Sequence, residues 1–151
     1  MATDIMTRDD VTALVIAAKK RKKLSWEGIA EEVGMSPIWT HMVATGMGAA
    51  PKEKAEILGR LLDLPEAAVA ELQECPSKDW NRDIPTDPCI YRLYEIAGVF
   101  GPSFKAMVHE KFGDGIMSAI DFDMSVSRVE DPKGDRVKVE MTGKFLAYKA
   151  W

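Results

Sequence analysis

Cysteine, histidine and long apolar runs are scarce in this sequence, and each shortage excludes a class of protein. The 151 residues include two cysteines and two histidines, too few for a disulfide framework or a metal cluster. No apolar run approaches the roughly 20 residues that a membrane-spanning helix needs. Asp4, Asp9 and Asp10 precede any basic cluster, which is untypical of secretory or transit peptides. We therefore expect a soluble, cytoplasmic protein with no metal and no membrane partner.

An excess of positive charge is also missing. The chain has 20 basic and 24 acidic side chains, for a formal net charge of −4, whereas nucleic-acid binders usually present a basic face. The basic run at residues 19–23 ends a predicted helix, where cations complement the helix dipole. The composition therefore argues against a nucleic-acid partner.

Helical periodicity dominates residues 9–74 and predicts five short helices. Each later helix begins at a residue suited to a helix start, namely Ser25, Ser36 with Pro37, Pro51 and Pro65. After Cys75, residues 76–89 are rich in proline, asparagine and aspartate, which is typical of a connector. We predict an all-α helical bundle over residues 1–81 and a second domain over residues 82–151.

The second domain is predicted to contain two helices and a β-hairpin, so the fold class is α+β. Asp87 and Pro88 begin one helix, and Gly101-Pro102 is expected to end it and begin another. From Ile116 the apolar period changes to two, which predicts strands on either side of a turn at residues 131–135. Because a two-stranded hairpin alone is marginally stable, we predict that this half is an obligate oligomerisation unit.

Residues 26–45 have the pattern of a helix-turn-helix, which makes a transcription regulator with a C-terminal dimerisation domain the alternative function. In DNA-binding proteins the second helix of this motif enters the major groove. Here that helix, residues 37–45, contains no arginine, lysine, asparagine or glutamine, the side chains that pair with bases and phosphates. A helix-turn-helix shape used for protein contacts is the favoured interpretation.

Arg92 and Glu95 are the candidate chemical groups on the predicted helix after residue 88. Three residues apart, they are neighbours on one helix face, flanked by Tyr91 and Tyr94. The plain alternative is a surface ion pair worth less than about 1 kcal/mol. Ser118 stands in an apolar run at residues 116–120, and a hydroxyl there needs a hydrogen-bond partner. Arginine and serine brought together at a subunit interface would form a small anion-binding pocket.

The two histidines, His41 and His109, offer no nucleophile or metal set. His109 follows Val108 and precedes Glu110 and Lys111 on a predicted helix. A solvated or hydrogen-bonded histidine is therefore expected at this position.

Three stretches of the second domain, residues 82–88, 91–95 and 105–122, resemble the cyanase (cyanate hydratase, or cyanate lyase) family. The resemblance is dense over residues 82–122 and looser over the rest of the chain. It implies bicarbonate-dependent decomposition of cyanate to carbamate and carbon dioxide, after which carbamate yields ammonia and more carbon dioxide. The family's catalytic arginine, glutamate and serine match Arg92, Glu95 and Ser118.

The resemblance also implies an architecture. The family's N-terminal domain resembles the DNA-binding domains of phage repressors but does not bind DNA. Its C-terminal halves, each two helices and a hairpin here, form intertwined dimers, and five dimers make a homodecamer with sites shared between subunits. The implied partners are cyanate and bicarbonate, the latter a co-substrate, with no metal or organic cofactor.

Three roles follow for the matched residues. Arg92 would offset the repulsion between two anions with its fork of donors, and Ser118 would donate to a developing oxyanion. Glu95 would either orient Arg92 or, when protonated, act as a donor itself. Orientation is the favoured role.

Overall fold

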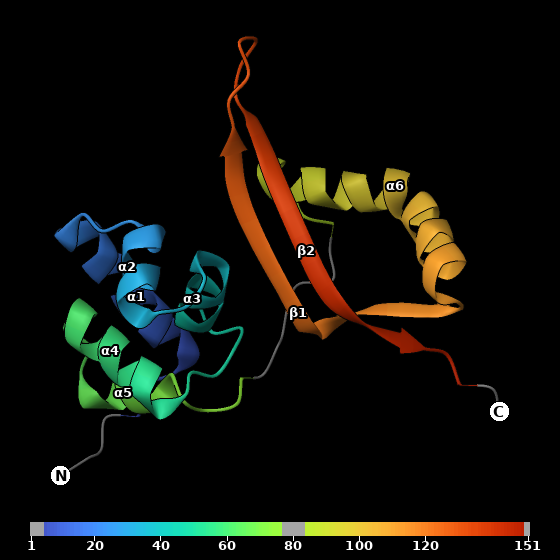
Figure 1. The fold of residues 1–151 in the computed structure, drawn as a ribbon. Helices are drawn as coiled ribbons and strands as arrows, with labels where there is room; N and C mark the ends of the chain where they lie inside the picture. The colour runs from blue at the N-terminus through green and yellow to red at the C-terminus, as the bar shows by residue number, and fades with distance from the viewer. Residues whose placement is uncertain (1–4, 77–83, 150–151) are drawn as a thin grey trace. The chain divides into compact units, whose positions relative to one another are not determined.

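The computed structural model describes residues 5–76 and 84–149, and the chain divides into two compact units (Figure 1). The predicted boundary between residues 81 and 82 lies within residues 77–83, outside the described residues. None of the helices in the described ranges is long and apolar enough to cross a membrane.

The first unit contains the five predicted helices. They are α1 (Arg8–Lys22), α2 (Trp26–Val33), α3 (Pro37–Ala44), α4 (Lys52–Leu62) and α5 (Glu66–Glu71). The hydroxyl of Ser25 accepts a hydrogen bond from the N–H of Gly28 at the start of α2. Ser36 caps α3 in the same way, through the N–H of Trp39. Two of the predicted starts are therefore confirmed at the level of individual hydrogen bonds.

An aliphatic core holds these helices together. Its largest fully buried apolar side chains come from α1 to α4 and from the residue after α5, and they are Val11, Val15, Ile29, Val33, Val43, Leu58, Leu62 and Leu72. Burial of one such side chain stabilises a fold by about 1.5–3 kcal/mol. The N-terminal unit therefore has a core of its own within one chain.

One continuous helix, α6 (Pro88–Phe112), replaces the two helices predicted for the second domain. Asp87 caps it by accepting hydrogen bonds from the N–H groups of Cys89 and Ile90. Pro102 lies inside the helix, where it lacks an N–H and its ring crowds the carbonyl four residues earlier. Helix α6 accommodates the proline by bending, as Figure 1 shows, and does not break. The prediction of a helix end at Gly101-Pro102 is wrong.

The predicted hairpin is confirmed as β1 (Gly115–Val129) and β2 (Arg136–Ala147), paired in a two-stranded sheet. The carboxylate of Asp131 holds the turn by accepting hydrogen bonds from Lys133 N–H and Arg136 Nε. β1 changes direction along its length (Figure 1). β2 runs without interruption through Gly143.

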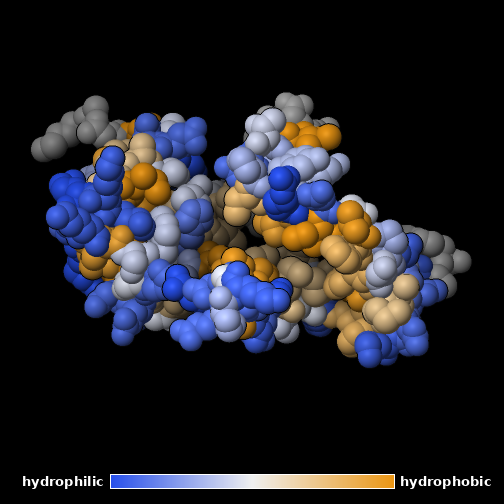
Figure 2. All heavy atoms as spheres, turned by 90° about the horizontal axis from the view of Figure 1, so that it is seen from above, coloured by the Kyte–Doolittle hydropathy of each residue, from blue (hydrophilic) through white to orange (hydrophobic). Residues whose placement is uncertain are grey.

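Helix α6 and the hairpin leave many of their apolar side chains exposed. No residue of α6 is buried, and Phe100 is 61% exposed. On the strands, Ile120 is 90% exposed and Val137 is 76% exposed. Figure 2 shows hydrophobic side chains gathered over this part of the surface. Uncovered apolar surface of this extent marks an interaction site.

Candidate active site

Arg92 and Glu95 face each other one turn apart on α6. Nη1 of Arg92 lies 3.6 Å from Oε2 of Glu95, and the side chains are 65% and 53% exposed. With Ile96, Val99 and Phe100 they line a hollow of about 300 Å³. The pair is therefore an open ion pair at the rim of an apolar surface, and its charges are screened by water in an isolated protomer.

An aromatic stack supports the guanidinium. The Cζ atom of Arg92 lies 5.5 Å from the centre of the Tyr91 ring, within the range of a cation–π contact. Tyr91 in turn stacks on Tyr94, with ring centres 6.4 Å apart and planes inclined by 29°. A cation–π contact draws on the charge of the guanidinium and takes up none of its N–H hydrogen bonds. The sequence places the tyrosines beside the pair, but the cation–π contact and the ring stacking depend on side-chain conformations that it does not show.

Ser118 is a buried hydroxyl on β1, 6% exposed. Its Oγ accepts hydrogen bonds from the backbone N–H groups of Ile120, at 3.1 Å, and Asp121, at 3.0 Å. A serine hydroxyl has two acceptor positions and one donor. Both acceptor positions are thus occupied, and the hydroxyl proton is left to be donated. The predicted need for a partner is met by local backbone, which favours Ser118 as a hydrogen-bond donor over a nucleophile.

The protomer brings together two of the three predicted site residues. Arg92 and Glu95 are paired, whereas within the described residues no hydrogen bond or ion pair connects Ser118 to either of them. Their joint assignment to one site stays a prediction.

His109 is held by hydrogen bonding, as its sequence context predicts. Its Nε2 lies 3.1 Å from the Gly115 carbonyl, its Nδ1 lies 3.5 Å from Oδ1 of Asp114, and its ring meets Tyr148 edge-on. His41 instead packs against Trp26, with ring centres 4.8 Å apart. Across residues 5–76 and 84–149, no three His, Cys, Asp or Glu side chains are grouped as metal ligands.

The larger hollow between α4 and α5, about 630 Å³, is lined by Lys52, Glu56, Arg60, Asp63 and Glu66 among others. Its charges are mixed, and it contains none of the three predicted site residues. The smaller hollow at Arg92 is therefore the candidate for anion chemistry.

Two family models cover most of the chain. The model described as the cyanate lyase C-terminal domain matches residues 82–150, and the model described as cyanate hydratase, N-terminal, matches residues 8–76. A solved structure, that of cyanase from T. urticae, matches with a TM-score of 0.80 and 33% identity, over 91% of this chain and 96% of that one. The fold is thus that of a cyanase-type lyase.

Curated relatives narrow the class further. Cyanate hydratase from Teredinibacter turnerae is 53% identical over 146 residues, which span 97% of this chain and all of the relative. Cyanate hydratase from Pseudomonas putida is 51% identical with the same coverage. The chain belongs to the cyanate hydratase family, and the resemblance read from its sequence is confirmed.

Proposed function

We propose that this protein is a cyanate hydratase that removes cyanate in a bicarbonate-dependent reaction. The observation that carries the proposal is identity of 53% with a cyanate hydratase over 97% of the chain. The products are carbamate and carbon dioxide, and carbamate then decays to ammonia and a second carbon dioxide. Atom balance requires one proton in the first step, because cyanate and bicarbonate are monoanions and carbamate carries a single negative charge.

The site residues suit a reaction between two anions. The guanidinium of Arg92 offers paired donors that match a planar anion, and its cation–π contact with Tyr91 uses no hydrogen-bond donor. Ser118 offers one further donor, because both its acceptor positions are filled by backbone N–H groups. Donors aimed at a developing negative charge stabilise it most in a water-excluded site.

Glu95 is assigned to orientation of Arg92. Its carboxylate lies 3.6 Å from the guanidinium, so it limits the rotamers available to the long arginine side chain. A carboxylate that faced the substrates directly would repel them. Proton delivery in the first step is the second role, and Glu95→Gln separates the two.

We assign the uncovered apolar surface of α6 and the hairpin to contacts between copies of the chain. Intertwined dimers, five to a decamer, would cover side chains such as Val99 and Phe100, which are 64% and 61% exposed. Enclosure would also lower the dielectric around Arg92 and strengthen its pull on anions. Sites shared between subunits would bring Ser118 to an Arg92–Glu95 pair.

The remaining elements of the proposal are a cytoplasmic location and a reaction without metal or organic cofactor. Bicarbonate is then a co-substrate, and the chain's own donors stabilise the charge. Removal of metal with a chelator should leave turnover unchanged.

The alternative function, a helix-turn-helix transcription regulator, is less well supported. The helices α2 and α3 form the expected pair, but α3 exposes Ile38 and Met42 rather than donors for bases or phosphates. A gel shift at low salt tests it, since non-specific binding to DNA strengthens steeply as salt falls. A shift by this chain would favour the regulator.

The deciding experiment is ammonia release from cyanate, with and without bicarbonate, by the wild-type chain and Arg92→Ala. We expect release that requires bicarbonate and is lost in the variant. Absence of release from the wild type would refute the proposed enzyme, whereas unchanged release by Arg92→Ala would refute only the site.

A further inference from the structure

We infer that Gly143 on β2 is a positioning residue that fixes the backbone of Ser118. This inference rests on the proposed function, because it gives a residue outside the predicted site a part in the same reaction. Strands β1 and β2 approach each other closely at Ser118.

A side chain at position 143 has no room. A Cβ atom there would lie 2.5 Å from the backbone carbonyl oxygen of Ser118 and 2.5 Å from Cγ of Met117. It would also lie 3.2 Å from Cδ2 of Phe122. Contacts below 3.0 Å are not tolerated by real Cβ atoms, and the carbonyl oxygen is backbone that cannot rotate away. Even alanine would therefore push β1 away from β2 at Ser118.

A second glycine makes the same close approach on the other strand. A Cβ atom at Gly115 of β1 would overlap the backbone carbonyl oxygen of Leu146 on β2 and the ring of Phe145. Gly115 and Ser118 are buried, unlike the other residues of β1. At both glycines, one close to Ser118 in sequence and one opposite it, the strands are therefore closer together than a side chain would permit.

The close approach of the strands also fixes the direction in which the Ser118 hydroxyl can donate its proton. Oγ of Ser118 accepts two hydrogen bonds from Ile120 and Asp121 on the same strand, so its remaining proton has a direction set by the backbone around it. A shift of β1 at Ser118 would change that direction. Misplacement of a catalytic group by about 1 Å can cost on the order of a hundredfold in rate.

The test compares Gly143→Ala with Gly28→Ala in the full-length protein. A Cβ atom at position 28 of α2 would meet only Oγ of Ser25, at 3.2 Å, the end of a flexible side chain, and α2 lies outside the surface assigned to contacts between copies, so this variant is the control. Thermal midpoint and sedimentation report folding and assembly, and ammonia release from cyanate reports turnover. We expect Gly143→Ala to assemble with turnover reduced about tenfold to a hundredfold, and Gly28→Ala to stay within about twofold.

A double-mutant cycle shows whether the effect passes through Ser118. In a Ser118→Ala background, Gly143→Ala should cost little more, because the group that it positions is already gone. Independent losses that multiply would overturn the inference, as would wild-type turnover in Gly143→Ala. Inactivity of the wild-type protein itself would instead refute the proposed function.

A further variant covers failure to fold. If Gly143→Ala does not assemble, Met117→Ala added to it removes the overlap with Cγ and leaves the overlap with the Ser118 carbonyl. An assembled double variant with turnover well below that of Met117→Ala alone supports the inference. A double variant that equals Met117→Ala, or that still fails to assemble, assigns Gly143 to the fold alone and overturns it.

Discussion

Arg92 and Glu95 form an ion pair across one turn of α6, with Nη1 and Oε2 3.6 Å apart, while both side chains stay more than half exposed. A pair this open contributes little to the stability of the protomer. It holds a guanidinium in place at a surface that is otherwise apolar. The Arg92–Glu95 ion pair therefore matters more for anion binding than for the stability of the fold.

Arg92→Lys should lose most of the turnover although it keeps the positive charge. Lysine is a point charge without the planar fork, so it cannot make two parallel hydrogen bonds to one anion. One charge-assisted hydrogen bond is worth about 1.5–3 kcal/mol, so we expect kcat/KM to fall by roughly tenfold to a hundredfold. Arg60→Lys, the same exchange at an exposed arginine of α4, is the matched control. Retention of kcat/KM in Arg92→Lys would show that charge alone suffices.

Glu95→Gln separates orientation of Arg92 from proton delivery. Glutamine keeps a carbonyl oxygen that can accept a hydrogen bond from the guanidinium, but it carries no transferable acid proton. If orientation is the role, kcat should fall by only a few-fold, and its dependence on pH should keep the wild-type shape. Steady-state kinetics over a range of pH measure this, and loss of turnover in Gln but not in Asp would establish proton delivery instead.

Ser118→Ala should lower turnover and also weaken the hairpin. Alanine removes the donor meant for the anion and leaves the N–H groups of Ile120 and Asp121 without their acceptor. We expect a loss of about 1 kcal/mol in the free energy of unfolding, measured by denaturant titration, together with a larger loss in kcat. Ser125→Ala, further along β1, is the control. Equal effects of the two substitutions on kcat would remove Ser118 from the site.

The helices of the N-terminal half could be predicted from the sequence because their starts are set by residues within one turn of each helix. Ser25 and Ser36 bond to N–H groups three residues ahead, so their effect is visible within one turn of sequence. Pro102 shows the opposite case. Whether a proline ends a helix or bends it depends on whether the following residues are held in place by other parts of the fold, and the sequence around Pro102 does not reveal that.

In the candidate site, too, local features could be predicted from the sequence, whereas contacts that depend on strand register or side-chain conformation could not. The spacing of Arg92 and Glu95 on one helix face is a local property, so sequence alone identified their pairing. The close approach of Gly143 to Ser118 joins residues 25 positions apart in different strands, and depends on strand register. The cation–π contact between Arg92 and Tyr91 depends on the rotamers of both side chains. Neither relationship leaves a signal that composition or periodicity detects.

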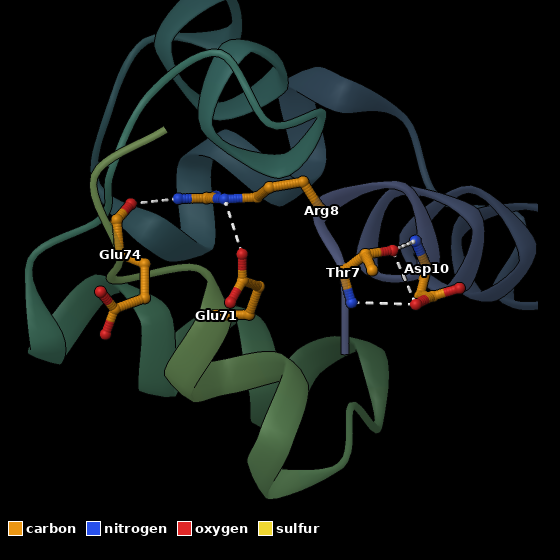
Figure 3. A network of polar contacts seen from close by, with 5 residues as sticks. All are labelled: Thr7, Arg8, Asp10, Glu71 and Glu74. Atoms are coloured by element: carbon orange, nitrogen blue, oxygen red, sulfur yellow. Dashed lines mark hydrogen bonds and ion pairs between the residues drawn. The ribbon is translucent and has the colours of Figure 1, made fainter. Parts of the chain in front are cut away.

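Arg8 should be a main determinant of stability in the helical unit (Figure 3). Its guanidinium donates to the carbonyl of Glu74 through Nη2, and its Nε lies 3.4 Å from Oε1 of Glu71. These contacts join the start of α1 to the end of α5, 66 residues away in sequence. We expect Arg8→Ala to lower the free energy of unfolding by about 1.5–3 kcal/mol, measured by denaturant titration. Lys52→Ala, whose partner Glu56 lies 4.0 Å away on an exposed surface, should change it by less than about 0.5 kcal/mol.

Asp10 should make the stability of α1 depend on pH. Its carboxylate accepts hydrogen bonds from the hydroxyl and the N–H of Thr7 in a capping box, and these bonds hold the pKa of Asp10 below its ordinary value of 3.8. A lowered pKa in the folded state means that the carboxylate stabilises the fold above pH 3.8, and that this contribution is lost as pH falls further. In Asp10→Asn the contribution is absent at every pH. The thermal midpoints of wild type and variant should therefore differ near neutral pH and converge at acid pH. A gap between wild type and Asp10→Asn that does not narrow in acid would show that the carboxylate charge is not the source.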